Sequence, residues 1–199
     1  FRQKFAQVTN PPIDPLREAI VMSLEVDLGG EGNLFEETER QARRVSLTSP
    51  VLSQGKFDSI LALNESGLRV QTIDATYDPD KTDLKAALTS LCQEAAAHVT
   101  GGANVLVLSD RGIGESRLPI HSLLATGATH HHLIANGLRA DANLIIETAS
   151  ARDSHQVACL LDFGATAIYP YLAYSVLSEQ LNNGEVLGAP AACYKNYRK

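Results

Sequence analysis

The chain of 199 residues has no tryptophan, a single methionine and only 6% aromatic residues. No apolar run in it approaches the roughly 18 residues that a membrane-spanning helix requires. Basic residues are also in the minority, because 17 Lys and Arg stand against 23 Asp and Glu, which gives a formal net charge of −6. A negative chain repels phosphate backbones and anionic lipid headgroups. The sequence therefore argues against nucleic acid and membranes as partners.

Cysteine is scarce as well. Cys92, Cys159 and Cys193 are an odd number of cysteines with no C-x-x-C spacing, which favours buried free thiols over a disulfide framework. The first residues are too polar for the apolar region of a signal peptide, so we expect a reducing, cytoplasm-like compartment. The chain starts at Phe1 without methionine and ends in a basic segment, and we expect it to be a fragment of a larger multidomain enzyme.

From residue 70 onward, strand and helix signals alternate. Apolar runs predict strands at 70–76, 104–109, 144–148 and 165–170, and helical spacing predicts helices at 84–99, 119–136, 154–163 and 174–181. Glycines follow the first three of these helices, as expected of helix ends. Continuous apolar strands that alternate with amphipathic helices indicate parallel strands covered on both faces. The predicted class is α/β, with four parallel β-α units over residues 70–199.

Four such units fit either half of an eight-unit barrel or an open doubly wound sheet. The loop after the first strand, Tyr77–Asp80, is acidic and has no glycine, unlike the phosphate loop typical of a doubly wound fold. We therefore favour a partial, truncated TIM-like barrel. Residues 1–69 read as an irregular N-terminal segment that contains a helix with Pro15 in its first turn and docks on the sheet. Within it, 45–52 and 59–64 are expected to be short strands or loops, and the whole chain is expected to be one domain.

Polar side chains gather at the predicted carboxyl ends of the strands, the edge where parallel α/β folds place functional groups. They are Asp74, Ser109, Asp110, Arg111, Glu147, Arg152, Asp153 and Tyr169. One interpretation is an acid–arginine network that fixes loops, because each acid has a cationic residue within a few positions. A second is an independent barrel-like enzyme that acts on a small anion through Arg111, Arg152 and His155. A stand-alone binding module is a third.

Two other motifs give weaker evidence for a functional site. Consecutive helical side chains point about 100° apart, so His130, His131 and His132 cannot converge on one ion, and we predict no metal site. The glycine-rich segments 29–32 and 111–114 complete neither G-x-G-x-x-G nor the Walker pattern, and nearby acids oppose a phosphate. We expect turns there.

Several longer segments resemble the central domain of the glutamate synthase large chain. They are Phe5–Pro15, Leu106–Gly112, His130–Ile134 with Gly137–Arg139, Glu147–Ala158, Gly164–Ala173 and Lys195–Lys199. The resemblance spans essentially the whole chain, and the segments follow one another in the family's order. It implies a reduced relative of that family's FMN-binding barrel, which agrees with the four β-α units.

The resemblance also implies a function. In this family a glutaminase domain releases ammonia, which passes through a tunnel to an FMN domain that makes glutamate from 2-oxoglutarate with the help of an iron–sulfur cluster. The central domain would connect the two, without cofactor, metal or chemistry of its own. Thr9 and Asn10 would line the tunnel, where Pro11 and Pro12 hold the backbone extended. Asp110, Arg111, Glu147, Arg152 and Asp153 would fix loops or interdomain contacts. The compartment would be the cytoplasm, or the plastid stroma in a plant or alga.

Overall fold

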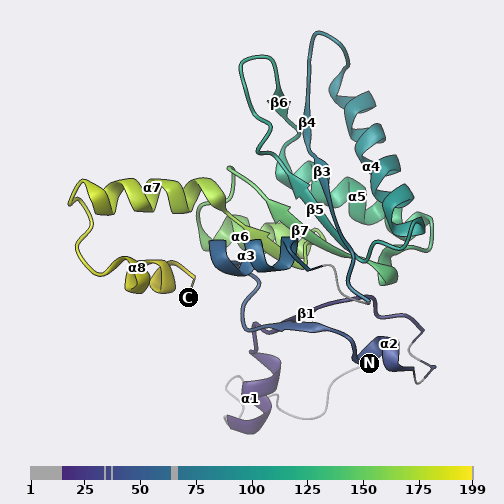
Figure 1. The fold of residues 1–199 in the computed structure, drawn as a ribbon, viewed down its shortest axis with the longest axis horizontal. Helices are drawn as coiled ribbons and strands as arrows, with labels where there is room; N and C mark the ends of the chain where they lie inside the picture. The colour runs from purple at the N-terminus through teal and green to yellow at the C-terminus, as the bar shows by residue number, and fades with distance from the viewer. Residues whose placement is uncertain (1–14, 34, 37, 64–66, 199) are drawn as a thin grey trace, which may run out of the picture.

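The computed structural model describes residues 15–198 except 34, 37 and 64–66, and its centre is a parallel sheet of four strands (Figure 1). The strands are β3 (Val70–Asp74), β5 (Val105–Ser109), β7 (Asn143–Glu147) and β8 (Ala167–Tyr169), in the order β3-β5-β7-β8. Their register sets Asp74 beside Ser109, Ser109 beside Glu147, and Glu147 beside Tyr169. Because all four strands are parallel, these polar residues share one edge of the sheet.

Helices α4 (Leu84–Thr100), α5 (Ser122–Ala135) and α6 (Ser154–Asp162) cover one face. Their boundaries follow from local chemistry. Asp83 and Asp153 cap α4 and α6, each accepting a backbone N–H three residues on. Gly102, Gly137 and Gly164 follow the three helices with positive φ, a conformation that glycine adopts without strain. These helices and the four strands match the predicted pattern to within a few residues.

The opposite face is covered by the N-terminal part of the chain. Strands β1 (Val26–Leu28) and β2 (Val45–Leu47) form an antiparallel pair, and α3 (Gln54–Leu61) buries Phe57 and Ile60 against the sheet. The expectation of a strand or loop at 59–64 is wrong for its first residues, which belong to α3. Ser53 caps this helix, and its two buried residues are spaced by three, as one helical face requires. Two short helices, α1 (Pro15–Val21) and α2 (Glu39–Ala42), complete this part.

The outer edge of β8 is also paired. The Leu52 N–H donates to the Ile168 carbonyl at 2.8 Å, and the Ile168 N–H donates to the Pro50 carbonyl at 2.8 Å. The strand order of the four-stranded sheet follows the chain without the reversal of a doubly wound sheet. The α/β class and the parallel sheet are confirmed. The described strands form an open sheet, and a partial TIM-like barrel stays a prediction.

After β8, the chain leaves the body as an arm made of α7 (Tyr171–Asn182) and α8 (Pro190–Tyr197) (Figure 1). The ring of Tyr174 in α7 makes edge contacts with Tyr194 and Tyr197 of α8. A small antiparallel pair, β4 (Thr76–Tyr77) and β6 (Leu118–Pro119), stands above the sheet, and a 3-10 turn (Arg139–Asp141) precedes β7. None of the helices in the described ranges is long and apolar enough to cross a bilayer.

Candidate functional site

The carboxyl edge of the sheet brings Ser109, Arg111 and Glu147 together. Glu147 ends β7 with 6% of its surface exposed. The Ser109 hydroxyl donates to Glu147 Oε2 at 2.6 Å, and Arg111 Nε donates to Oε1. Both oxygens of this buried carboxylate are therefore occupied. A buried carboxylate needs such partners, because desolvation of an unpaired charge costs several kcal/mol.

Asp110 is equally buried, and it holds the loop after β7. Its Oδ2 accepts a hydrogen bond from the Thr148 hydroxyl at 2.7 Å, and both its oxygens lie 3.1 Å from the Ala149 N–H. The Asp110 N–H in turn donates to the Glu147 carbonyl at 3.1 Å. Asp110 thus binds the residues that follow β7, and Glu147 binds residues at the end of β5. Together the two acids join the ends of these strands.

Arg111 lies against two tyrosines. Its guanidinium carbon is 4.3 Å from the ring centroid of Tyr171 and 5.7 Å from that of Tyr169. Burial alone would lower the pKa of Arg111, but the hydrogen bond and charge of Glu147 outweigh it and the pKa is raised. Burial, followed by a hydrogen bond to Asp110, raises the pKa of Tyr171. Tyr171 is therefore a neutral phenol at physiological pH, and its ring forms a cation–π contact with Arg111.

Asp74, at the end of β3, has a partner that the sequence did not suggest. Arg117 Nη2 donates to Asp74 Oδ2 at 2.6 Å, and Arg117 Nε donates to the Thr76 hydroxyl at 2.8 Å. These residues are 43 and 41 positions apart. The expectation that each acid pairs with a cation a few residues away is wrong here, and also for Glu147, whose partner is Arg111 and not Arg152. Arg117 directly precedes β6 and bridges to Gly114, and the sequence analysis missed this small pair of strands.

The remaining predicted residues lie elsewhere. Asp153 caps α6 by accepting the Gln156 N–H at 2.8 Å, and the backbone carbonyl of Arg152 accepts the Tyr197 hydroxyl at 3.1 Å. His155 lines a pocket between α5 and α6, where its Nε2 lies 3.7 Å from Cys159 Sγ. Arg111 lines a different pocket, beside α3 and α7, and Arg152 lines neither. Neither pocket therefore contains more than one of the three residues of the anion-acting enzyme hypothesis.

The histidine run has a packing role. The Arg139 Nε donates to His130 Nδ1 at 2.9 Å, and a Cβ added to Gly164 would lie 2.3 Å from the same nitrogen. Burial, followed by the charge of Arg139, lowers the pKa of His130. Among the residues that the structure describes, no three His, Cys, Asp or Glu side chains form a metal-binding group. The three cysteines lie on α4, α6 and α8, an arrangement that does not fit an iron–sulfur cluster.

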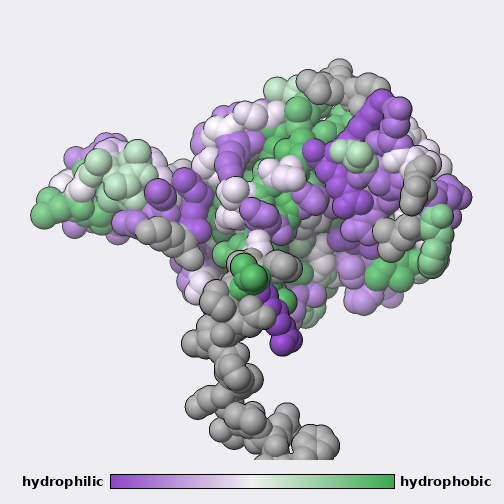
Figure 2. Space-filling model, turned by 90° about the horizontal axis from the view of Figure 1, so that it is seen from below, coloured by the Kyte–Doolittle hydropathy of each residue, from purple (hydrophilic) through white to green (hydrophobic). Residues whose placement is uncertain are grey.

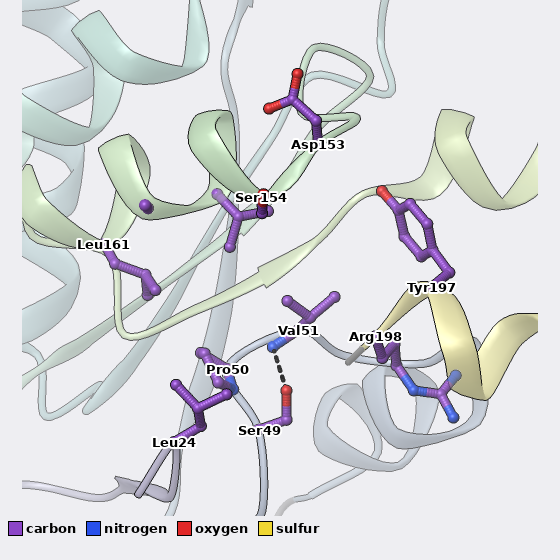
Figure 3. Close-up of a pocket in the computed structure, with 11 residues that line it drawn as sticks. Leu24, Ser49, Pro50, Val51, Asp153, Ser154, Leu161, Tyr197 and Arg198 are labelled. Carbon is purple, nitrogen blue, oxygen red and sulfur yellow. Dashed lines mark hydrogen bonds between the residues drawn. The ribbon is translucent and has the colours of Figure 1, made fainter. Parts of the chain in front are cut away.

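A mostly apolar pocket lies where α6, segment 49–51 and α8 meet (Figure 3). Val51, Leu161 and Tyr197 contribute apolar wall, and Asp153 stands at its rim near the start of α6. Its described lining contains no histidine, lysine or cysteine that could act as a base or a thiol nucleophile. Thr9 and Asn10 lie outside the described residues.

Comparisons with known proteins agree with the resemblance in the sequence. The family model "Glutamate synthase central domain" matches residues 1–199. The chain is 48% identical over 178 residues to the chloroplastic ferredoxin-dependent glutamate synthase of Oryza sativa, a match that covers 87% of this chain and 11% of the relative. It is 43% identical over 215 residues to ferredoxin-dependent glutamate synthase 2 of Synechocystis, with 100% of this chain and 14% of the relative covered.

A third relative is the NADPH glutamate synthase large chain of Bacillus subtilis, 40% identical over 186 residues, with 94% of this chain and 12% of the relative covered. The chain thus spans only a small part of the length of these relatives, which include enzymes named for ferredoxin and for NADPH. With a family model matched from end to end and identities of 40% or more, the chain belongs to the glutamate synthase central domain family.

Proposed function

We propose that this chain is the connecting domain of a glutamate synthase, placed between a glutaminase domain and an FMN-binding synthase domain of the same polypeptide. The parent enzyme would make glutamate from glutamine and 2-oxoglutarate. The match over 199 residues, against 11–14% of the length of the relatives named above, supports a role as one part of a much longer protein. Its compartment would be that of the parent enzyme, cytoplasmic or plastid.

The observation that carries this proposal is the state of the strand-end carboxylates. Ser109 and Arg111 occupy both oxygens of Glu147, while Thr148 and Ala149 occupy those of Asp110. A general acid or base needs a free position at a reacting group, and a nucleophile needs an adjacent base. These carboxylates instead fix the loops after β5 and β7. Arg152 and Asp153, beside the start of α6, would serve contacts with neighbouring domains.

The cofactors of the proposed reaction would belong to other domains. FMN and the iron–sulfur cluster are assigned to the parent chain, because three cysteines on three helices cannot supply the four thiolates of a typical cluster. In the same proposal Thr9 and Asn10 contribute the mouth of the ammonia tunnel, and the four β-α units are the remainder of a TIM-like barrel.

The surface supports contact with other domains. Several large apolar side chains are mostly exposed, among them Leu16 at 81%, Met22 at 76% and Leu187 at 89%. Figure 2 shows apolar surface at the end of the α7–α8 arm and near the centre of the same face, separated by polar groups. In the connecting role, the adjoining domains of the parent chain would cover such groups.

The test is coupling in the full-length enzyme. Val has nearly the size of Thr but lacks its hydroxyl. In Thr9→Val, glutamine hydrolysis should therefore continue, while the amount of glutamate formed per glutamine falls severalfold and free ammonia rises. Thr9→Ser keeps the hydroxyl and should retain coupling, and Thr100→Val, at the exposed end of α4, makes the same substitution at another position as a control. Unchanged coupling in Thr9→Val would remove the tunnel role. Glutaminase activity or 2-oxoglutarate reduction by the 199-residue chain alone would contradict the connecting role.

A further inference from the structure

A second pocket opens at the carboxyl edge of the sheet, between the start of α3 and the α7–α8 arm. Its volume is about 470 Å³, within the range of small-molecule sites. Arg111 and Arg198 are the charged residues in its lining, which otherwise consists of tyrosine, serine, glutamine and glycine. In a chain with a net charge of −6, a pocket whose charged lining is entirely basic stands out.

Arg111 is held rigidly at this pocket. Glu147 binds its Nε, and the Tyr171 ring stacks on the guanidinium at 4.3 Å. Tyr171 is the first residue of α7, so the start of that helix carries its ring to the sheet edge. Only Nε of the Arg111 side chain is bound to Glu147, the Tyr169 hydroxyl lies near enough to the guanidinium for the two groups to interact, and 49% of the Arg111 side chain remains exposed. A guanidinium fixed in this way can present two donors in the geometry that suits a planar carboxylate.

The first turn of α3 also contributes to the pocket lining. The first N–H groups of a helix have no acceptor within it, and Ser53 Oγ takes only that of Lys56 in α3. Gln54 and Gly55, the next residues of this first turn, line the pocket. A Cβ added to Gly55 would meet nothing within 4 Å, so the space beside this turn is open. These N–H groups add partial positive charge to that of the two arginines.

The local charge balance distinguishes between anions. Glu147 and Asp110 lie behind the lining, each buried and hydrogen-bonded, and their two negative charges offset those of Arg111 and Arg198. A phosphate dianion would meet a nearly neutral environment with two fixed carboxylates behind it. A singly charged carboxylate needs only the Arg111 fork and one further cation. The aromatic rings of Tyr171 and Tyr174 provide apolar wall for its carbon skeleton.

We propose that this pocket binds a small molecule with one carboxylate on an apolar or aromatic skeleton, the carboxylate held bidentately by Arg111 with Arg198 and the first turn of α3 in support. The site shares Arg198 with the pocket between α6, segment 49–51 and α8, and its other lining residues are different. It does not depend on the connecting function, because it rests on residues within this chain.

The test uses the full-length polypeptide that contains these residues. It is titrated with benzoate, benzamide or inorganic phosphate at constant ionic strength, and binding is measured by isothermal titration calorimetry. Benzoate should bind at least about ten times more tightly than its neutral isostere benzamide, as one charge-assisted bidentate contact predicts. Phosphate should bind more weakly than benzoate. In Arg198→Gln, benzoate affinity should fall about tenfold. In Arg111→Lys, which keeps the positive charge but loses the two-donor guanidinium, benzoate affinity should fall by a similar factor.

Lys85→Gln removes one exposed positive charge from α4 and should leave benzoate affinity unchanged. NMR provides a second measurement, in which benzoate should shift the backbone amides of Gln54 and Gly55 at concentrations that leave the α4 amides unaffected. Equal affinity for benzoate and benzamide, or unchanged affinity in both arginine variants, would overturn the proposal. Tighter binding of phosphate than of benzoate would refute the carboxylate assignment.

Discussion

At the residue scale, two buried acids determine the geometry of the strand ends. Glu147 and Asp110 are 6% and 4% exposed; Glu147 pairs with Ser109 in the β5–β7 register, and Asp110 is the next residue after Ser109. Burial of such groups is tolerated because each has donors to both oxygens. The donors come from different segments, so the acids convert two separate loops into one rigid edge. Glu147 at that edge binds Arg111, and Arg111 in turn contacts the ring of Tyr171.

Replacing Asp110 by Asn tests this dependence. With the amide oxygen in the place of Oδ2, the new NH2 group lies 3.1 Å from the Ala149 N–H, so two donors face each other in a buried setting; in the opposite orientation the Thr148 hydroxyl loses its acceptor. The free energy of unfolding in urea should fall by about 1–3 kcal/mol. Asp80→Asn, at an exposed turn, makes the same chemical change and should stay within about 0.5 kcal/mol of the parent. Equal stability of the two variants would show that Asp110 does not hold the loop.

The sequence located these residues but not their partners. Parallel strands end at one edge, so a strand pattern was enough to predict that Asp110, Arg111 and Glu147 gather there. Pairing across 36 residues for Glu147 and Arg111, or 43 for Asp74 and Arg117, depends on strand register and on the small β4–β6 pair. No local pattern encodes either distance. The stacking of Tyr171 on Arg111 was likewise invisible, because it arises only when the start of α7 returns to the sheet edge.

At the element scale, predictability followed the strength of local signals. Helices α4 and α6 have an aspartate cap and a glycine stop, and both were placed within a few residues. Helix α3 was missed because it is only eight residues long and ends at Leu61 without a glycine. Its stability comes from the burial of Phe57 and Ile60 against a sheet that forms from residues far along the chain. Tertiary contact, not propensity, selects the helix there.

His130 in α5 gives a prediction about pH. Its folded pKa lies below the unfolded value near 6.5, so the folded state prefers the neutral ring. The resulting stability is complete above pH 6.5 and is lost as pH falls through the folded pKa. Replacing His130 by Gln keeps an acceptor for Arg139 and removes the titration. Urea unfolding should therefore show a smaller loss of stability between pH 7 and pH 5 in His130→Gln than in the parent.

Another histidine of the same helix provides the control. His132→Gln makes the same substitution and retains His130, so the loss of stability that His130 causes between pH 7 and pH 5 should persist. If His130→Gln and His132→Gln behave alike, the contact with Arg139 and Gly164 does not exclude the proton. The same comparison assigns a structural role to one member of the histidine run.

At the scale of the whole molecule, the sheet has a hydrophobic core on each face. Ile73, Leu106 and Ile146 pack against α4, α5 and α6, while Val107 and Ile145 pack against α3 and the β1–β2 pair. Alternate residues of the same strand thus serve both layers, as strand geometry requires. Because both layers pack on this shared sheet, we predict that the described parts of residues 15–69 and 70–198 unfold as one cooperative unit. The alternation of strand and helix patterns predicted the class of fold, but the docking of the N-terminal part depends on side-chain fit.

Leu52 is the residue through which cooperativity can be tested, because it is fully buried and its backbone pairs with Ile168 of β8. Leu52→Ala should cost about 2–5 kcal/mol. If the chain unfolds as one unit, the amides of α3 and α4 should lose the same amount of protection against hydrogen exchange in Leu52→Ala, although α4 lies on the opposite face. Hydrogen exchange measured by mass spectrometry checks this. Leu61→Ala, at the exposed end of α3, should change neither. Loss of protection in α3 with α4 unchanged would instead divide the chain into two independent units, because the sheet would then hold its helical layer without the N-terminal layer.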